Sequence, residues 1–109
     1  MDNKVIAHDG IVVLNKENKI IVFNEAASRI TGFQNRDVIS KQGDFLFSSS
    51  DVKNLLLNQC LTSGEVFSNI SLSINCSNNK KINVTASISP LSQPSHGIIG
   101  IILVFRDAQ

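Results

Sequence analysis

The sequence predicts an α+β domain built on one antiparallel sheet. Strand patterns gather at the two ends of the chain, over residues 11–23 and 70–105, and short helical patterns lie between them. Grouped strands with intervening helices are typical of an antiparallel sheet that carries its helices on one side. A chain of 109 residues is long enough for one hydrophobic core and too short for two.

The first element is a hairpin that runs into a helix. Residues 11–14 and 20–23 are continuous apolar runs, and the polar residues 15–19 between them have turn chemistry. Asn24 stands where a helix N-cap belongs, because its side-chain oxygen can accept a hydrogen bond from the first turn. Gly32 then ends a short helix as a left-handed cap.

The middle of the chain carries shorter helical patterns. A helical turn is expected from Asn35 to Gly43, and residues 44–47 are apolar enough to pack inside. Residues 48–51 offer helix caps, and Gly64 closes the helix that follows. The apolar face of that helix has three- and four-residue spacings, at Val52, Leu55, Leu56 and Cys60.

The last third of the chain is predicted to be β structure. Residues 70–76 and 82–88 alternate apolar with polar side chains around a turn at 77–80, as in a hairpin with one wet face. Pro90 is expected to end the second of these strands. After a loop, residues 98–105 form a final apolar strand.

Several landmarks recur in the order that a known family shows. They are Asp9-Gly10-Ile11, the helix-leading Asn24 with Ala26 and Ala27, Gly32-Phe33, Ser89-Pro90, Gly97, Gly100 and the closing Arg106-Asp107. In this order and spacing the chain resembles a PAS domain, a sensory module of signalling proteins. The family usually continues with a hydrophobic residue and Thr after the Asp, where this chain has Ala108-Gln109.

The resemblance implies a PAS fold, a five-stranded antiparallel sheet with short helices packed on one face and the first and last strands central. Residues 1–8 would be a flanking segment or linker, and residues 9–109 the domain. The continuous apolar runs at 11–14 and 98–105 suit central strands, and the alternating strands 70–76 and 82–88 suit outer ones.

Residues 11–14, 20–23 and 98–105 are apolar on both faces of the predicted sheet, although helices can cover only one face. Leaving Ile and Val side chains in water forgoes about 1.5–3 kcal/mol for each. The N-terminal segment, a flanking helix or a second copy of the domain could cover the outer face. We predict a homodimer through that face.

Members of the family bind haem, flavin or small metabolites, and the residues argue against two of these. Residues 34–67 contain no His that could ligate haem, and His8 and His96 lie in terminal and loop positions. Cys60 lies in Asn-Gln-Cys-Leu-Thr-Ser, which is unlike the covalent flavin motif of light-oxygen-voltage domains. We therefore expect neither haem nor covalent flavin, whereas a small apolar ligand or metabolite remains possible.

An apolar pocket between sheet and helices would be the ligand site. Its predicted lining is Phe33, Leu46, Phe47, Leu56, Cys60, Phe67 and Ile88. The alternative is that these residues pack on one another as ordinary core. Outer-strand polar residues could contact a ligand or simply form a solvated face, namely Ser71, Ser73, Asn83, Thr85 and Ser87.

No catalytic triad, phosphate loop or metal-ligand spacing occurs, so we expect no enzyme and no metal site. A net charge of +1 gives no basis for nucleic-acid or membrane binding. The N-terminus lacks an apolar signal segment, so a cytoplasmic location is expected. We predict a sensory domain of a larger histidine kinase or transcriptional regulator, which relays a signal through its last strand to an effector domain. The alternative is a dimerisation module without a ligand.

Overall fold

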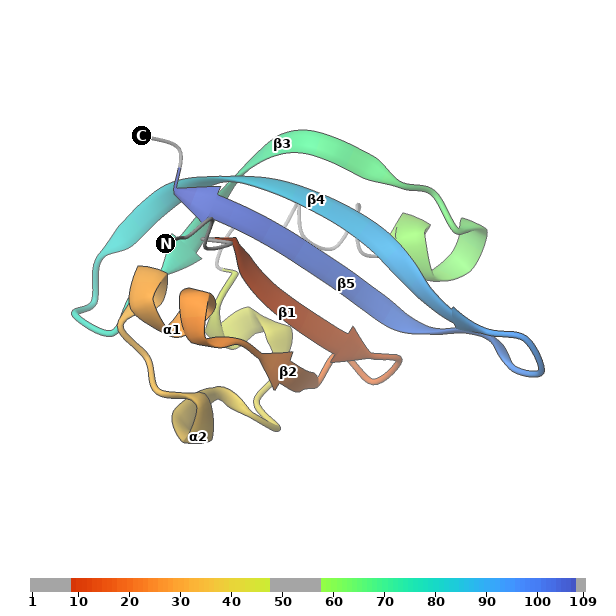
Figure 1. Cartoon of the computed structure of the whole chain (residues 1–109), viewed down its shortest axis with the longest axis horizontal. Helices are drawn as coiled ribbons and strands as arrows, with labels where there is room; N and C mark the ends of the chain where they lie inside the picture. The colour runs from red at the N-terminus through yellow and green to blue at the C-terminus, as the bar shows by residue number, and fades with distance from the viewer. Residues whose placement is uncertain (1–8, 48–57, 108–109) are drawn as a thin grey trace, which may run out of the picture.

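The computed structural model describes residues 9–47 and 58–107, which form one antiparallel sheet with short helices (Figure 1). The strand order is β2-β1-β5-β4-β3, which confirms the predicted five-stranded α+β fold with the first and last strands in central positions. The elements are β1 (Gly10–Asn15), β2 (Ile20–Phe23), α1 (Glu25–Thr31), α2 (Asn35–Val38), the 3-10 turn η1 (Gly43–Phe45), β3 (Phe67–Asn75), β4 (Lys81–Gln93) and β5 (Gly97–Asp107).

Asn24 caps α1 and also fastens it to β1. Its side-chain oxygen accepts hydrogen bonds from the backbone N–H groups of Ala27 and Ile11, each at 2.9 Å. Its side-chain amide donates to the Asp9 carbonyl at 3.2 Å. Gly32 ends the helix in the left-handed conformation, with φ +83°. The predicted cap and stop are confirmed, and Asn24 has the further role of joining helix to sheet.

The segment after α2 corrects one prediction. Gly43 does not end the helical turn: α2 ends at Val38, and Gly43 begins η1. Hydrogen bonds draw the intervening backbone beside β2, from Ile20 N–H to the Lys41 carbonyl and from Ser40 N–H to the Ile20 carbonyl, both 2.8 Å. These bonds to β2, which the local sequence does not reveal, divide the segment into two turns.

Part of the second predicted helix is described. Residues 58–63 are helical, and the helix ends at Gly64, which has φ +76°. The Gly64 N–H donates a hydrogen bond of 3.0 Å to the Cys60 carbonyl. The earlier part of this helix, including Val52, Leu55 and Leu56, lies outside the described residues.

Pro90 does not end β4, which continues to Gln93. The pairing of β3 with β4 reaches only as far as Phe67 opposite Ile88, whereas β4 pairs with β5 from Val84 to Gln93. Beyond Ile88, the described residues therefore place a ladder partner on one side of β4 only. Proline lacks an N–H and is tolerated at such an edge position.

The predicted outer position of strand 82–88 is also wrong, because β4 lies between β5 and β3. β3 is the outer strand, as expected. The polar–apolar alternation of residues 82–88 reflects a wet face of the sheet and says nothing about whether the strand lies at an edge.

The core lies between the helices and the face of the sheet that we call the inner face. Side chains from all five strands meet Ala27, Val38 and Cys60 there in one buried cluster, and those of β1, β3, β4 and β5 come from alternate positions. None of the helices in the described part of the chain is long and apolar enough to cross a lipid bilayer.

Candidate functional site

The structure brings six of the seven predicted pocket residues into one hydrophobic cluster. Leu46, Phe47, Cys60 and Ile88 are at most 3% exposed, and they pack directly in the core. Phe33 and Phe67 are partly buried against the same cluster, and Leu56 lies outside the described residues. The close packing agrees with the ordinary-core interpretation, and binding of a ligand among these residues stays a prediction.

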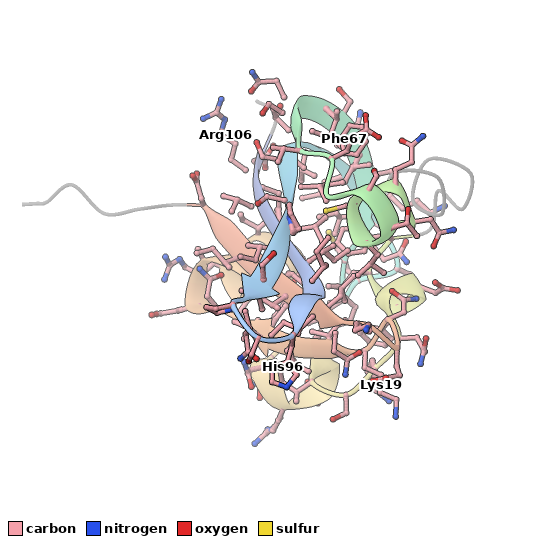
Figure 2. All side chains as sticks on the ribbon, turned by 90° about the vertical axis from the view of Figure 1, so that its right-hand side faces the viewer. Lys19, Phe67, His96 and Arg106 are labelled. Carbon is pink, nitrogen blue, oxygen red and sulfur yellow. The ribbon has the colours of Figure 1, made fainter. Side chains whose placement is uncertain are left out.

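The two cysteines and His96 differ in their surroundings. Burial raises the pKa of the Cys60 thiol, so this side chain stays protonated in the core. The pKa of Cys76 is also raised, mainly by burial and additionally by the carboxylate of Asp107. His96 is exposed in the β4–β5 loop, at the end of the molecule opposite Arg106 (Figure 2).

A pocket of about 320 Å³ opens where the β3–β4 turn meets the helical side of the domain; we call it the turn pocket. It is lined by Phe33, Phe45, Asn75, Cys76, Ser77, Asn79 and Lys80. Phe33 is thus the one predicted pocket residue that lines it. In Figure 1 the β3–β4 turn lies next to α1, and the hydrogen bond from Ser77 N–H to the Thr31 carbonyl, 2.8 Å long, joins them.

The outer face of the sheet divides into two halves of different chemistry. Val13 pairs with Val22 on β2 and with Ile102 on β5, and Ile11 pairs with Val104. These five residues, the apolar half, alternate with core residues and therefore share the outer face. Among them Val22 is 42% exposed, and its neighbour Ile21 is 47% exposed.

The outer-face side chains are polar on β4 and β3. Ser87 stands opposite Val104, Ser89 opposite Ile102, and Thr85 opposite Arg106. On β3 the outer-face positions continue the change, with Ser71 opposite Thr85 and Ser73 opposite Asn83. We call these β4 and β3 positions the polar half.

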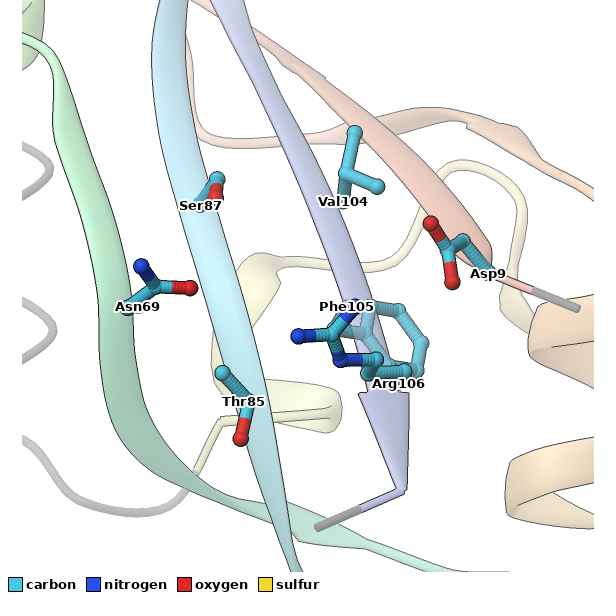
Figure 3. A pocket seen from close by; sticks show the side chains of 7 residues that line it. All are labelled: Asp9, Asn69, Thr85, Ser87, Val104, Phe105 and Arg106. Atoms are coloured by element: carbon cyan, nitrogen blue, oxygen red, sulfur yellow. The ribbon is translucent and has the colours of Figure 1, made fainter.

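A small hollow of about 70 Å³ marks the boundary between the halves; we call it the sheet pocket (Figure 3). In Figure 3, Asn69, Ser87 and Val104 follow one another across neighbouring strands, and Asp9 lies beyond Val104. Asn69 has φ +56° at the bulge of β3. The hollow is far below the roughly 300–1,000 Å³ of ligand pockets, so it suits a single side chain or water.

Sequence reasoning missed most of the turn pocket and the sheet pocket. Residues 77–80 are recognisable as a turn, and Phe45 as an inward residue, but their meeting depends on tertiary hydrogen bonds. Asn69 is hidden because a bulge changes the strand's register at that point. The apolar half was the part with a clear signal, namely apolar runs without alternation.

A family model of the PAS domain matches residues 8–109. The chain belongs to the PAS domain family. PAS domains are sensory modules generally used in signalling proteins, and they are typically regulatory rather than catalytic. A search of curated protein sequences gives no match.

Solved structures of PAS domains share the fold at low identity. The PAS domain of a protein from Colwellia psychrerythraea has a TM-score of 0.80 and 14% identity over 93% of this chain and 86% of that one. The PAS-B domain of Drosophila melanogaster Cycle, with bound ethylene glycol, has a TM-score of 0.75 and 17% identity over 90% and 98%. The light-state dimer of the fungal blue-light photoreceptor Vivid has a TM-score of 0.75 and 13% identity over 96% and 81%.

Proposed function

We propose that this PAS domain is the sensory part of a larger cytoplasmic histidine kinase or transcriptional regulator, and that it works as a homodimer joined through the apolar half. A ligand or partner would shift the packing of helices on the sheet between two states. The shift would leave through Arg106 and Asp107 at the end of β5 into an effector domain.

The observation that carries this proposal is the apolar half itself. Val22 of this half is 42% exposed, and Ile21 beside it on the edge strand β2 is 47% exposed. Fully burying a Val or Ile side chain contributes about 1.5–3 kcal/mol, so covering the roughly half of each side chain that is exposed here would contribute about 1 kcal/mol. A second copy presents the same surface, so a two-fold interface would bury both patches together. Vivid, a structural relative, is a dimer in its light state.

The position of β5 supports a route from core to output. It pairs with β1 on one side and β4 on the other, so its inner face touches the core and its outer face belongs to the apolar half. Ile101, Leu103 and Phe105 are buried on the inner face, while Ile102 and Val104 lie on the outer face. A change in core packing would therefore reach the dimer surface within one strand.

The second candidate is a dimerisation module that senses no ligand. The close packing of Leu46, Phe47, Cys60 and Ile88, each at most 3% exposed, favours it. Native mass spectrometry and an absorption spectrum of the purified domain distinguish the two functions. A retained small molecule supports the sensor, and a colourless, empty dimer supports the module.

A fusion experiment tests the proposed signalling. The chain is joined through Asp107 to a DNA-binding domain that is active only as a dimer, and reporter output is measured. We expect Val22→Asp to abolish the output and Ser71→Asp, which places the same charge in the polar half, to preserve it. Output that is equal in both variants, with both folded, would contradict the proposal.

A further inference from the structure

Of the described residues expected to surround a ligand in the core, the turn pocket shares only Phe33, and its lining has a chemistry of its own. Two phenyl rings form one wall, and the β3–β4 turn supplies amides, a hydroxyl and the ammonium of Lys80. We propose that the turn pocket binds a small planar aromatic carboxylate. The proposal goes beyond the dimer-based function and does not depend on it.

The aromatic wall is held in place by its surroundings. The rings of Phe33 and Phe45 have their centroids 4.8 Å apart and are tilted by 46°. Phe33 is fixed at its backbone, because its N–H donates to the Thr31 hydroxyl and its carbonyl accepts from the Ser28 hydroxyl. The Phe45 carbonyl accepts from the side-chain amide of Asn75 at 3.2 Å. Such a preformed wall can contact an aromatic ligand without being ordered on binding.

The opposite wall is a compact turn. The Cys76 N–H donates to the Lys80 carbonyl at 2.7 Å, and the Asn79 N–H donates to the Cys76 carbonyl at 3.1 Å. Ser77 is bound to the end of α1 through the Thr31 carbonyl. These bonds hold the turn beside the phenyl rings, and Phe33 and Ser77 are both bonded to Thr31 at the end of α1.

The charge around the pocket favours an anion. Lys80 is the charged residue of the lining, and the ammonium of Lys41 lies 5.7 Å from the centroid of the Phe45 ring. Among the described residues, two carboxylates lie near the lining: Asp107 acts on Cys76 from the end of β5, and Asp44 directly precedes Phe45 in η1. A bound carboxylate would therefore lie near Lys80 and away from Asp107.

The dimensions and the thiol agree with a small aromatic ligand. A volume of about 320 Å³ is at the lower end of the roughly 300–1,000 Å³ that ligand pockets occupy. The raised pKa of Cys76 keeps its sulfur in the neutral thiol form, which is a soft, polarizable neighbour for an aromatic ring. The ligand would make apolar contacts with Phe33, Phe45 and Cys76 and an ionic contact with Lys80.

Titration of the complete chain with 2-naphthoate, followed by NMR of the backbone amides, tests the proposal. We expect saturable shifts at Phe33, Phe45, Ser77 and Lys80, and slower alkylation of Cys76 by iodoacetamide in the presence of the ligand. The neutral 2-naphthamide should bind more weakly. Absence of saturable shifts, or shifts centred on Leu46 and Ile88 in the core, would overturn the proposal.

A variant and its matched control separate recognition of the ligand's charge from nonspecific binding. Lys80→Gln should weaken 2-naphthoate binding about fivefold, because an exposed ion pair contributes up to about 1 kcal/mol. Lys81→Gln removes the same charge from the neighbouring exposed position of β4 and should change the affinity less than about twofold. Equal affinities of the two variants would contradict recognition of the anion by Lys80.

Phe33→Leu tests the aromatic wall, because it keeps an apolar side chain at the position. It should weaken 2-naphthoate and 2-naphthamide by similar factors, and unchanged affinity for both would contradict the proposal. Thermal unfolding of each variant checks that the fold is retained. If the chain is monomeric and still binds 2-naphthoate, the proposed dimer is wrong and the proposed ligand site stands. The two proposals can therefore fail separately.

Discussion

The two halves of the outer sheet face share one backbone ladder and differ in their side chains. The apolar half on β2, β1 and β5 presents Ile and Val, whereas the polar half on β4 and β3 presents Ser, Thr and Asn. The change occurs between β5 and β4, where Val104 stands opposite Ser87. The apolar half therefore has a reason to be covered, and the polar half can remain in water.

The inner face shows no such division. Leu72 and Val84 in the polar-half strands are buried like Val12 and Leu103 in the apolar-half strands. All four belong to one cluster beneath the helices. The outer face, and not the core, is thus where this domain distinguishes one end of its sheet from the other.

The largest expected effect breaks the contact between β1 and β5, which holds the apolar half together. A Cβ atom at Gly100 would overlap the Leu14 carbonyl oxygen, so Gly100→Ala must push the two strands apart. We expect a loss of about 3 kcal/mol in the free energy of unfolding, measured by urea denaturation.

Gly97→Ala is the matched control for this prediction. Nothing lies within 4 Å of a Cβ there, and the cost comes from φ +71° alone. Its expected loss is about 1 kcal/mol. Equal losses of stability for the two variants would show that the close approach of β1 and β5 is not what makes Gly100→Ala destabilising.

The next effect concerns the attachment of the apolar half's first strand to α1. Asn24→Ala removes the cap of the helix and leaves the Ile11 N–H without its acceptor. Each loss costs about 1 kcal/mol, so we expect about 2 kcal/mol in urea denaturation. Asn24→Asp keeps the accepting oxygen and should lose less than half as much. If Asn24→Asp lost as much stability as Asn24→Ala, the role of the side-chain oxygen as a hydrogen-bond acceptor would be wrong.

Substitutions between Val and Thr, whose side chains have nearly the same shape, compare the two halves directly. Val13→Thr places a hydroxyl at a position only 8% exposed among Val22 and Ile102, and should cost about 1 kcal/mol. Thr85→Val in the polar half should change stability by less than about 0.5 kcal/mol. Thermal unfolding measures both, and equal costs would mean that the halves do not differ in their demand for apolar side chains.

The smallest effect concerns the electrostatics of Cys76, which lines the turn pocket on the other side of the sheet from the polar half. Asp107→Asn removes one of the two causes that raise the pKa of Cys76, so the thiolate fraction at pH 8 should increase. Alkylation of Cys76 should become about twofold faster. Cys60, whose pKa is raised by burial alone, should keep its rate and serves as the internal reference. An unchanged Cys76 rate would contradict the influence of Asp107.

Sequence reasoning could predict the elements that depend on local chemistry. Asn24 and Gly32 mark the helix ends because a cap oxygen and a left-handed φ are local requirements. The apolar runs on β1 and β5 indicate central strands because each face of such a strand meets apolar neighbours. These features do not need knowledge of distant contacts.

The remaining features depend on pairing across the sheet. Pro90 is compatible with β4 because β3 has already ended its pairing opposite Ile88. Gly43 begins η1 because the preceding backbone is bonded to β2. The turn pocket likewise depends on Ser77 reaching the end of α1. No local sequence pattern shows which distant segments will be bonded to one another.

Homodimer formation through the apolar half is decided by sedimentation velocity of the full chain over a wide concentration range, alongside Val22→Asp and Ser71→Asp. We expect the unaltered chain and Ser71→Asp to shift to a dimer as concentration rises, while Val22→Asp stays a folded monomer. An unaltered chain that remains monomeric at the highest concentration, or a dimer that survives Val22→Asp and dissociates with Ser71→Asp, would contradict it.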